Sequence, residues 1–185
     1  MKLKRSMKYK KFSIDRKYII MGLALALVSM FIDIWPFVFL SLFCFLNSMV
    51  LSIDRYVSAP VDLEFSTFSA ILFTKVYGLP WGIAAGLITK LVAMLYNKRV
   101  TVDHFFMMGG YTIAAFVASM IPGNNIIIIG VIVTLIVNLY IVFVSKFITM
   151  LSFYETLMYG SSNVIFNTVL FIGFSEFLYK LMIFL

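Results

Sequence analysis

A few polar side chains stand in an otherwise strongly apolar chain, and these are the groups that could do chemistry. Asn163 and Asn167 are spaced i and i+4, so they share one face of a helix. Asn138 belongs to the preceding apolar segment, close to the aromatic Tyr140. A carboxamide in hydrocarbon must find hydrogen-bond partners. These asparagines therefore either orient the polar edge of a ligand or bond neighbouring helices to one another.

Charged side chains gather around a second feature, a pair of apolar segments in the first half of the chain. Two carboxylates precede the first segment, and Glu64 is the second of them. Each segment carries one lysine, Lys75 in the first and Lys90 in the second. A lysine near a helix end usually extends its ammonium group to the membrane interface, which suits Lys75. Lys90 lies deeper, so it either reaches the interface or belongs to an internal polar site.

The elements that must position these charges are two membrane helices meeting at a tight bend. Apolar segments at 65–77 and 83–96 flank the sequence Gly-Leu-Pro-Trp-Gly. Pro80 cannot continue a helix, and its ring disfavours the helical conformation for the residue before it. We expect the first helix to end near Gly78 and the second to begin at or just after the proline.

Composition predicts a multi-pass, all-α membrane protein. Hydrophobic residues make up 63% of the 185 residues, charged residues only 12%, and mean hydropathy is +1.04. Soluble domains average about 25% charged residues. The apolar segments are continuous rather than alternating, which disfavours a transmembrane barrel. We expect one transmembrane helical domain over 18–185, surrounded by membrane lipids.

Basic residues are concentrated at the N-terminus. Eight of the fifteen lysines and arginines lie within residues 1–17, directly before the first apolar segment. This distribution indicates a cytoplasmic tail beside anionic lipid headgroups and a cell-membrane location, and it disfavours a nucleic-acid partner. No small-residue cleavage site follows the first apolar segment, so we expect it to remain as an uncleaved helix.

The number of membrane spans is open between six and seven. The apolar segments cover 18–33, 36–53, 65–77, 82–96, 104–121, 125–151 and 156–183. Seven spans would place Arg55, Lys98 and Arg99 in the cytoplasm together with the N-terminus, as the distribution of positive charge favours.

Several kinds of chemistry are disfavoured by composition. Cys44 is the only cysteine and His104 the only histidine, so a disulfide, a cysteine-rich site or a multi-histidine metal site is not expected. A GxxxxGK[ST] phosphate-binding loop is missing, and no acidic pair or serine–histidine pattern suggests an intramembrane enzyme. We expect no catalytic residue, no metal ion and no cofactor.

The motifs resemble those of one transporter family. Leu63–Ser66 (LEFS), Gly78–Gly82 (GLPWG) and the central Lys90 are similar to the S-component of energy-coupling factor (ECF) vitamin transporters, riboflavin-type branch. Val137–Tyr140 and Gly160–Asn167 are similar to the family's last two helices. The chain departs from the riboflavin pattern at Phe166, where the family has a lysine.

The resemblance implies a substrate-binding subunit of six helices that captures a small vitamin-like molecule, while a transmembrane T-component and ATPase subunits energise uptake. The substrate-binding residues would be Glu64, Lys90, Asn138, Tyr140, Asn163 and Asn167. Trp81 and Tyr159 could stack on a planar ligand. The family docks on its T-component through small residues of the first helix, here Gly22, Ala24 and Ala26.

Two questions remain open, the number of helices and the function. The family has a loop at the place where this chain has the apolar segment 36–53. We therefore expect a six-helix core with an inserted membrane segment, up to seven helices in all. The chain also resembles membrane scaffold proteins of the MreD type, which would need a partner-binding face but no polar pocket.

Overall fold

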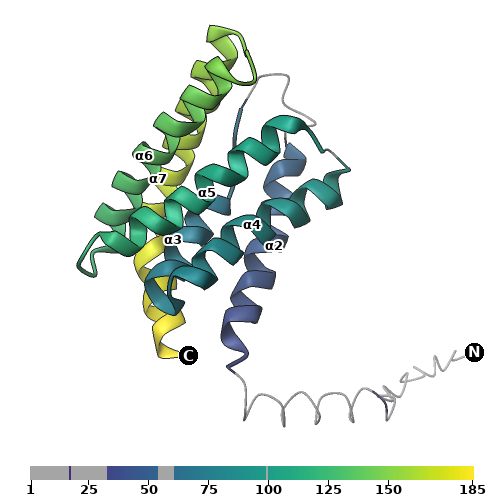
Figure 1. Ribbon diagram of the computed structural model, residues 1–185. Coiled ribbons are helices and arrows are strands. Elements are labelled where there is room, and N and C mark those ends of the chain that lie inside the picture. The colour runs from purple at the N-terminus through teal and green to yellow at the C-terminus, as the bar shows by residue number, and fades with distance from the viewer. Residues whose placement is uncertain (1–16, 18–32, 54–60, 99) are drawn as a thin grey trace, which may run out of the picture. The chain divides into compact units, whose positions relative to one another are not determined.

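The computed structural model describes Lys17 and residues 33–53, 61–98 and 100–185. Within these ranges the chain forms six α-helices and no strand, so the predicted all-α bundle is confirmed (Figure 1). The helices are α2 (Trp35–Ile53), α3 (Ser66–Tyr77), α4 (Leu79–Asn97), α5 (Val102–Met120), α6 (Ile126–Phe147) and α7 (Phe153–Phe184). All six belong to one compact unit, Trp35–Leu185. The predicted docking residues Gly22, Ala24 and Ala26 lie outside the described residues, as does the basic tail apart from Lys17.

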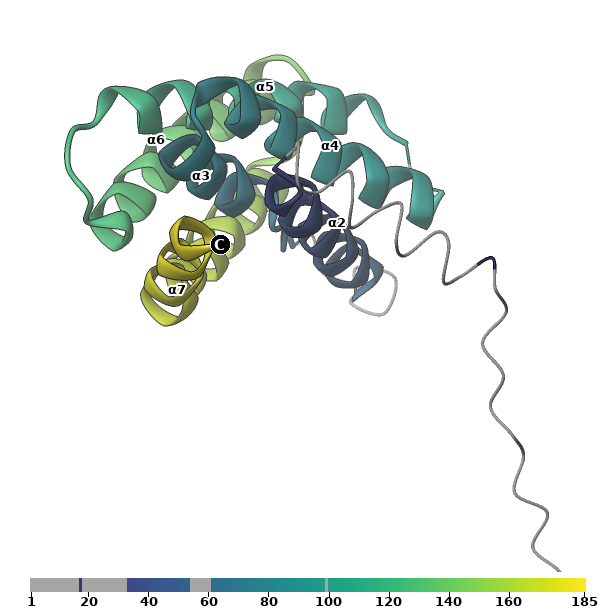
Figure 2. The same cartoon turned by 90° about the horizontal axis from the view of Figure 1, so that it is seen from below.

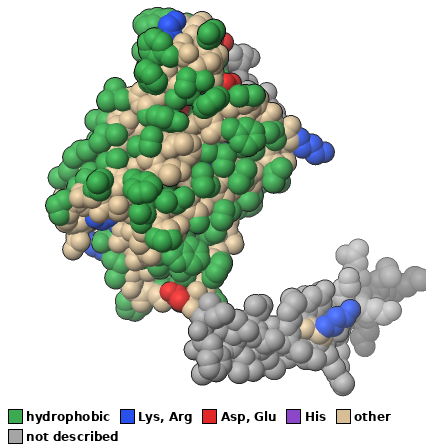
Figure 3. Space-filling model, in the orientation of Figure 1, with side chains coloured by type: hydrophobic (Ala, Val, Ile, Leu, Met, Phe, Trp, Pro, Cys, Tyr) green, Lys and Arg blue, Asp and Glu red, His purple; other side chains and the backbone are tan. Residues whose placement is uncertain are grey.

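The helix lengths and the surface of the bundle are those of a membrane protein. Four of its helices, α2, α4, α6 and α7, are long and apolar enough to cross one. Hydrophobic side chains cover much of the face shown in Figure 3. Many of these exposed residues are large, such as Leu139, Phe143 and Phe177, and water would disfavour so large an apolar surface. The protein is therefore membrane-embedded, and the inserted segment expected at 36–53 is a helix, α2.

The predicted bend between α3 and α4 is present. Gly78 joins the two helices with φ 92°, a conformation that other residues rarely adopt, and Pro80 lies in the first turn of α4. Gly82 brings the helices close, because a Cβ atom there would lie 2.8 Å from the carbonyl oxygen of Ala70. Gly82 thus lies on a close internal contact between α3 and α4.

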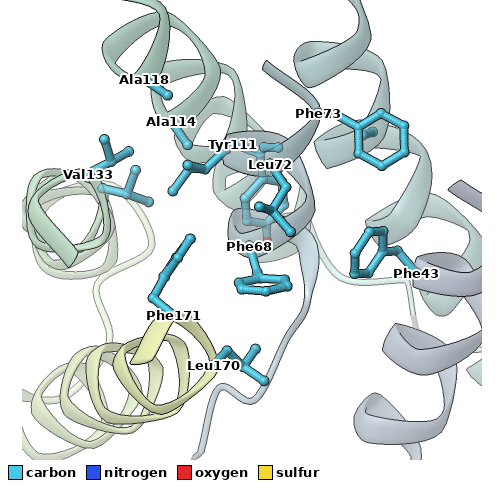
Figure 4. Packing of buried hydrophobic residues seen from close by; sticks show 14 of the residues in the cluster. Phe43, Phe68, Leu72, Phe73, Tyr111, Ala114, Ala118, Val133, Leu170 and Phe171 are labelled. Atoms are coloured by element: carbon cyan, nitrogen blue, oxygen red, sulfur yellow. The ribbon is translucent and has the colours of Figure 1, made fainter. Parts of the chain in front are cut away.

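The short helix α3 forms the centre of the bundle. It contacts every other helix that the structure describes, and its residues 66–74 are all buried. Figure 2 shows α3 lying among these helices. Phe68 on α3 packs between aromatic rings from both sides, with ring centroids 5.9 Å from Phe43 and 4.8 Å from Phe171 (Figure 4). At 12 residues α3 is too short to span a membrane alone.

Helices α6 and α7 run antiparallel and pack along their length (Figure 1). Their register is fixed at two points: Gly130 on α6 faces the ring of Phe171, and Asn138 on α6 bonds to Asn163 on α7. The side chain of Asn125 caps the N-terminus of α6 by accepting from the backbone of Ile128. A capping box begins α7.

Candidate functional site

The site begins in the extended segment that leads into α3. The backbone nitrogen of Phe65 donates to Asn47 Oδ1 of α2 at 2.7 Å, and that of Asp62 donates to Ser162 Oγ of α7 at 2.9 Å. These bonds satisfy backbone N–H groups that have no partner within a helix or sheet. They hold the side chains of Asp62 and Glu64 inside the bundle, where both residues are at most 5% exposed.

A buried ion cluster joins this segment to α4 and α5. Lys90 Nζ lies 2.8 Å from Glu64 Oε2 and 3.9 Å from Asp62 Oδ1, and the lysine is 1% exposed. The hydroxyl of Tyr111 donates to Glu64 Oε2, and the centroid of its ring lies 5.9 Å from Lys90 Nζ. Buried charges are tolerated when they are paired and hydrogen-bonded. Of the two possibilities for Lys90, the structure therefore shows the internal polar site.

Three asparagines extend the cluster into α6 and α7. Asn163 Nδ2 donates to Asp62 Oδ2 at 2.9 Å and to Glu64 Oε1 at 3.4 Å. Its Oδ1 accepts from Asn138 Nδ2 at 2.9 Å and from Asn167 Nδ2 at 3.2 Å. Asn163 is thus the link between the carboxylates and the seam of α6 and α7. We call the set Asp62, Glu64, Lys90, Tyr111, Asn138, Asn163 and Asn167 the buried polar network.

The structure brings together five of the six residues that the sequence predicted for substrate binding. Glu64, Lys90, Asn138, Asn163 and Asn167 are members of the network. The sixth, Tyr140, is separate from it: its hydroxyl donates to the carbonyl oxygen of Phe106 at 3.1 Å, and it lines a neighbouring cavity.

That cavity has a volume of about 80 Å³ and shares Asp62 with the network. It lies at the end of the bundle where α4 connects to α5 and α6 connects to α7. Its polar lining includes Thr101 and Thr149 from the two connections. Asp103, His104, Tyr140 and Tyr159 add polar groups from the adjoining helices. His104 Nδ1 is 3.0 Å from the hydroxyl of Thr101. The arrangement offers carboxylates, hydroxyls and aromatic rings to a small polar molecule.

Two other residues singled out from the sequence lie away from this site. Trp81 packs against aromatic rings at the opposite end of α4, with its ring centroid 5.1 Å from that of Phe37. Lys75 donates to the carbonyl oxygen of Ile121 at 3.0 Å, which satisfies a carbonyl at the end of α5. Trp81 is therefore not placed to stack on a molecule in the cavity.

The sequence did not identify two members of the buried polar network, Asp62 and Tyr111. The position of Asp62, two residues before Glu64, was the available signal, since extended backbone with this spacing places both side chains on the same side. Tyr111 gave a weaker signal, a phenol among the small and apolar residues of α5. Its partner Glu64 is 47 positions away, and no local pattern links them.

No family model, curated protein or solved structure matches this chain. What the site can do follows from its own chemistry. Among the described residues, no group of three or more histidines, cysteines or carboxylates could hold a metal ion. Paired charges and oriented amides beside a small cavity are groups that can bind a small polar molecule.

Proposed function

We propose that this chain is the membrane-embedded substrate-binding subunit of an uptake system for a small vitamin-like solute, energised by partner ATPase subunits. What supports the proposal is the convergence of the buried polar network on a cavity. Charged and amide groups are costly in a membrane interior, and their usual use there is to bind or conduct a solute. The network draws side chains from α4, α5, α6, α7 and the segment before α3, which is how a pocket between helices is built.

The solute would bind where Asp62 joins the network to the cavity. At about 80 Å³ the cavity is smaller than the roughly 300–1,000 Å³ of most ligand pockets. A vitamin-sized molecule therefore requires its walls to move apart. Wall residues that lie outside the helices, such as Thr101, Thr149 and Leu151, are suited to this movement.

The partners and orientation belong to the same proposal. A T-component would dock on the small residues Gly22, Ala24 and Ala26, whose side chains allow close helix approach. The basic tail would hold the N-terminus in the cytoplasm at the cell membrane. The chain itself would not hydrolyse ATP, since the phosphate-binding loop is missing from its sequence.

A membrane scaffold of the MreD type is the second candidate, and one observation favours it. Lys90 already has Glu64 as a partner at 2.8 Å, and Asn163 is hydrogen-bonded through both atoms of its amide. Charges and amides that bond to one another in this way can fix helix packing without any ligand.

Copurification of the tagged full-length chain in mild detergent separates the two functions. The uptake proposal expects nucleotide-binding subunits and a second transmembrane subunit in the eluate. Recovery of cell-shape proteins without ATPase subunits would favour the scaffold and overturn the proposal.

A further inference from the structure

The three asparagine amides of the buried polar network share one orientation, with each nitrogen directed toward the carboxylate end of the network. The carboxylates of Asp62 and Glu64 can only accept, so Asn163 must turn its nitrogen toward them. Its oxygen then faces Asn138 and Asn167, which must in turn present their nitrogens. The two outer oxygens, Asn138 Oδ1 and Asn167 Oδ1, therefore point away from the carboxylates.

This alignment makes the outer oxygens stronger acceptors than isolated amides. Hydrogen bonds in series polarise one another, and the effect is larger in a medium of low dielectric constant. Each outer oxygen ends a series that starts at a carboxylate and passes through Asn163. The partial negative charge on the two outer oxygens, in the seam between α6 and α7, is therefore increased.

Those outer oxygens have no hydrogen-bond partner. In the part of the chain that the structure describes, four buried side-chain oxygens are in this condition: Thr134 Oγ1, Asn138 Oδ1, Thr156 Oγ1 and Asn167 Oδ1. Leaving a buried acceptor unsatisfied is unfavourable, and native proteins rarely do so without a reason. Their residues are all at most 5% exposed.

Three of the four lie together. Asn138 and Asn167 both donate to the same oxygen of Asn163, so their carboxamides are neighbours. Thr134 is one turn before Asn138 on α6, and Asn138 also donates to its carbonyl oxygen at 2.9 Å. The antiparallel register that pairs Gly130 with Phe171 and Asn138 with Asn163 places Thr134 opposite Asn167. Thr156 is about three turns from Asn167 along α7, and it lines a groove of α6 and α7 that Asn138 also lines.

We propose that Thr134 Oγ1, Asn138 Oδ1 and Asn167 Oδ1 form a binding site for an alkali-metal cation, within the seam of α6 and α7. Uncharged hard oxygens suit such a cation, whereas transition metals prefer imidazole or thiolate ligands, which this seam lacks among its described residues. The polarised amides and the carboxylates behind Asn163 offset the cost of a positive charge in the bundle. The site does not depend on the identity of the solute or on its uptake.

Sodium is the probe, and thermal melting of the purified full-length chain in detergent is the measurement. The melting temperature is followed in sodium chloride and in choline chloride at equal ionic strength, because choline is too large for the site. We expect a saturable rise with sodium, since a ligand that binds only the folded state stabilises it by mass action. Binding of radioactive sodium to the same preparation should saturate over the same range.

Thr134→Val is the test variant, because it removes the hydroxyl and keeps the shape of the side chain. It should abolish the sodium-dependent rise. Thr156→Val is the matched control, since it removes a buried unpaired hydroxyl outside the site, and it should keep the rise. Equal melting temperatures of the wild type in the two salts would overturn the proposal, as would a full sodium response in Thr134→Val.

Discussion

Lys90 is the basic member of the buried polar network. Its ammonium lies 2.8 Å from Glu64 and 3.9 Å from Asp62. The sequence identified Lys90 and the asparagines because polar groups are conspicuous in an apolar chain. It could not pair them, because the bond between Asn163 and Asp62 joins residues 101 positions apart. Tyr111 was missed for the same reason.

Replacing Lys90 by methionine should therefore destabilise the bundle strongly. The change leaves Glu64 buried without its ammonium partner, and loss of one member of a buried ion pair costs about 3–5 kcal/mol. Thermal melting in detergent measures the effect. The double variant Glu64→Gln with Lys90→Met should recover part of the loss, because it removes both charges.

Lys180→Met is the matched control for that experiment. Lys180 also pairs with a glutamate, Glu176 at 3.4 Å, but both side chains are more than 60% exposed, at 74% and 63%. Exposed pairs contribute little to stability. If Lys90→Met melted at the temperature of Lys180→Met, the buried pair would have no structural role.

At the scale of elements, the bend of α3 and α4 was predictable and the central position of α3 was not. Gly78 and Pro80 determine the bend locally, so the sequence placed it within a residue or two. The extended segment before α3 is held instead by Asn47 and Ser162, which belong to other helices. An extended segment that is held by hydrogen bonds to distant side chains has no periodic pattern in its own sequence from which its position could be predicted.

Gly82→Ala should weaken the contact between α3 and α4. Its methyl group would lie 2.8 Å from the carbonyl oxygen of Ala70, and backbone atoms can yield only if the helices move apart. We expect a lower melting temperature than in the wild type. Gly173→Ala is the control, because no atom lies within 4 Å of its added methyl group. Equal melting of the two variants would mean that α3 and α4 are not in close contact.

For the molecule as a whole, composition predicted the membrane bundle but not its orientation. Apolar content alone decides that the helices lie in lipid. The side on which each connection lies depends on the number of spans, and the first apolar segment falls almost entirely outside the described residues. Seven spans, which the distribution of positive charge favours, would place the connection of α4 and α5 in the cytoplasm, whereas the six spans of the family that the motifs resemble would place it outside.

Single cysteines at Thr101 and Asn124, with Cys44 replaced by serine, test this arrangement. Both positions are exposed, and they flank α5. An impermeant thiol reagent applied to intact cells should label Thr101→Cys, as the uptake proposal expects, and Asn124→Cys only after the cells are opened. Labelling of both from the same side would show that α5 does not cross the membrane.

The reverse pattern would have a different meaning. Labelling of Asn124→Cys alone from outside would keep α5 as a span and place the cavity on the cytoplasmic side. That result would support seven spans and count against capture of an external solute.

The most direct test of the central claim compares the small molecules retained by the wild type, Asn163→Ala and Asn97→Ala after purification, measured by mass spectrometry together with melting temperature. Both substitutions remove a buried amide: Asn97 bonds α4 to Ser48 of α2, outside the network. If the network binds a solute, Asn163→Ala should lose affinity by about 1–3 kcal/mol, which is roughly 5- to 150-fold, while Asn97→Ala retains the molecule of the wild type. If both variants lower the melting temperature and retain the same molecules in the same amounts as the wild type, the network holds helices together and does not bind a solute.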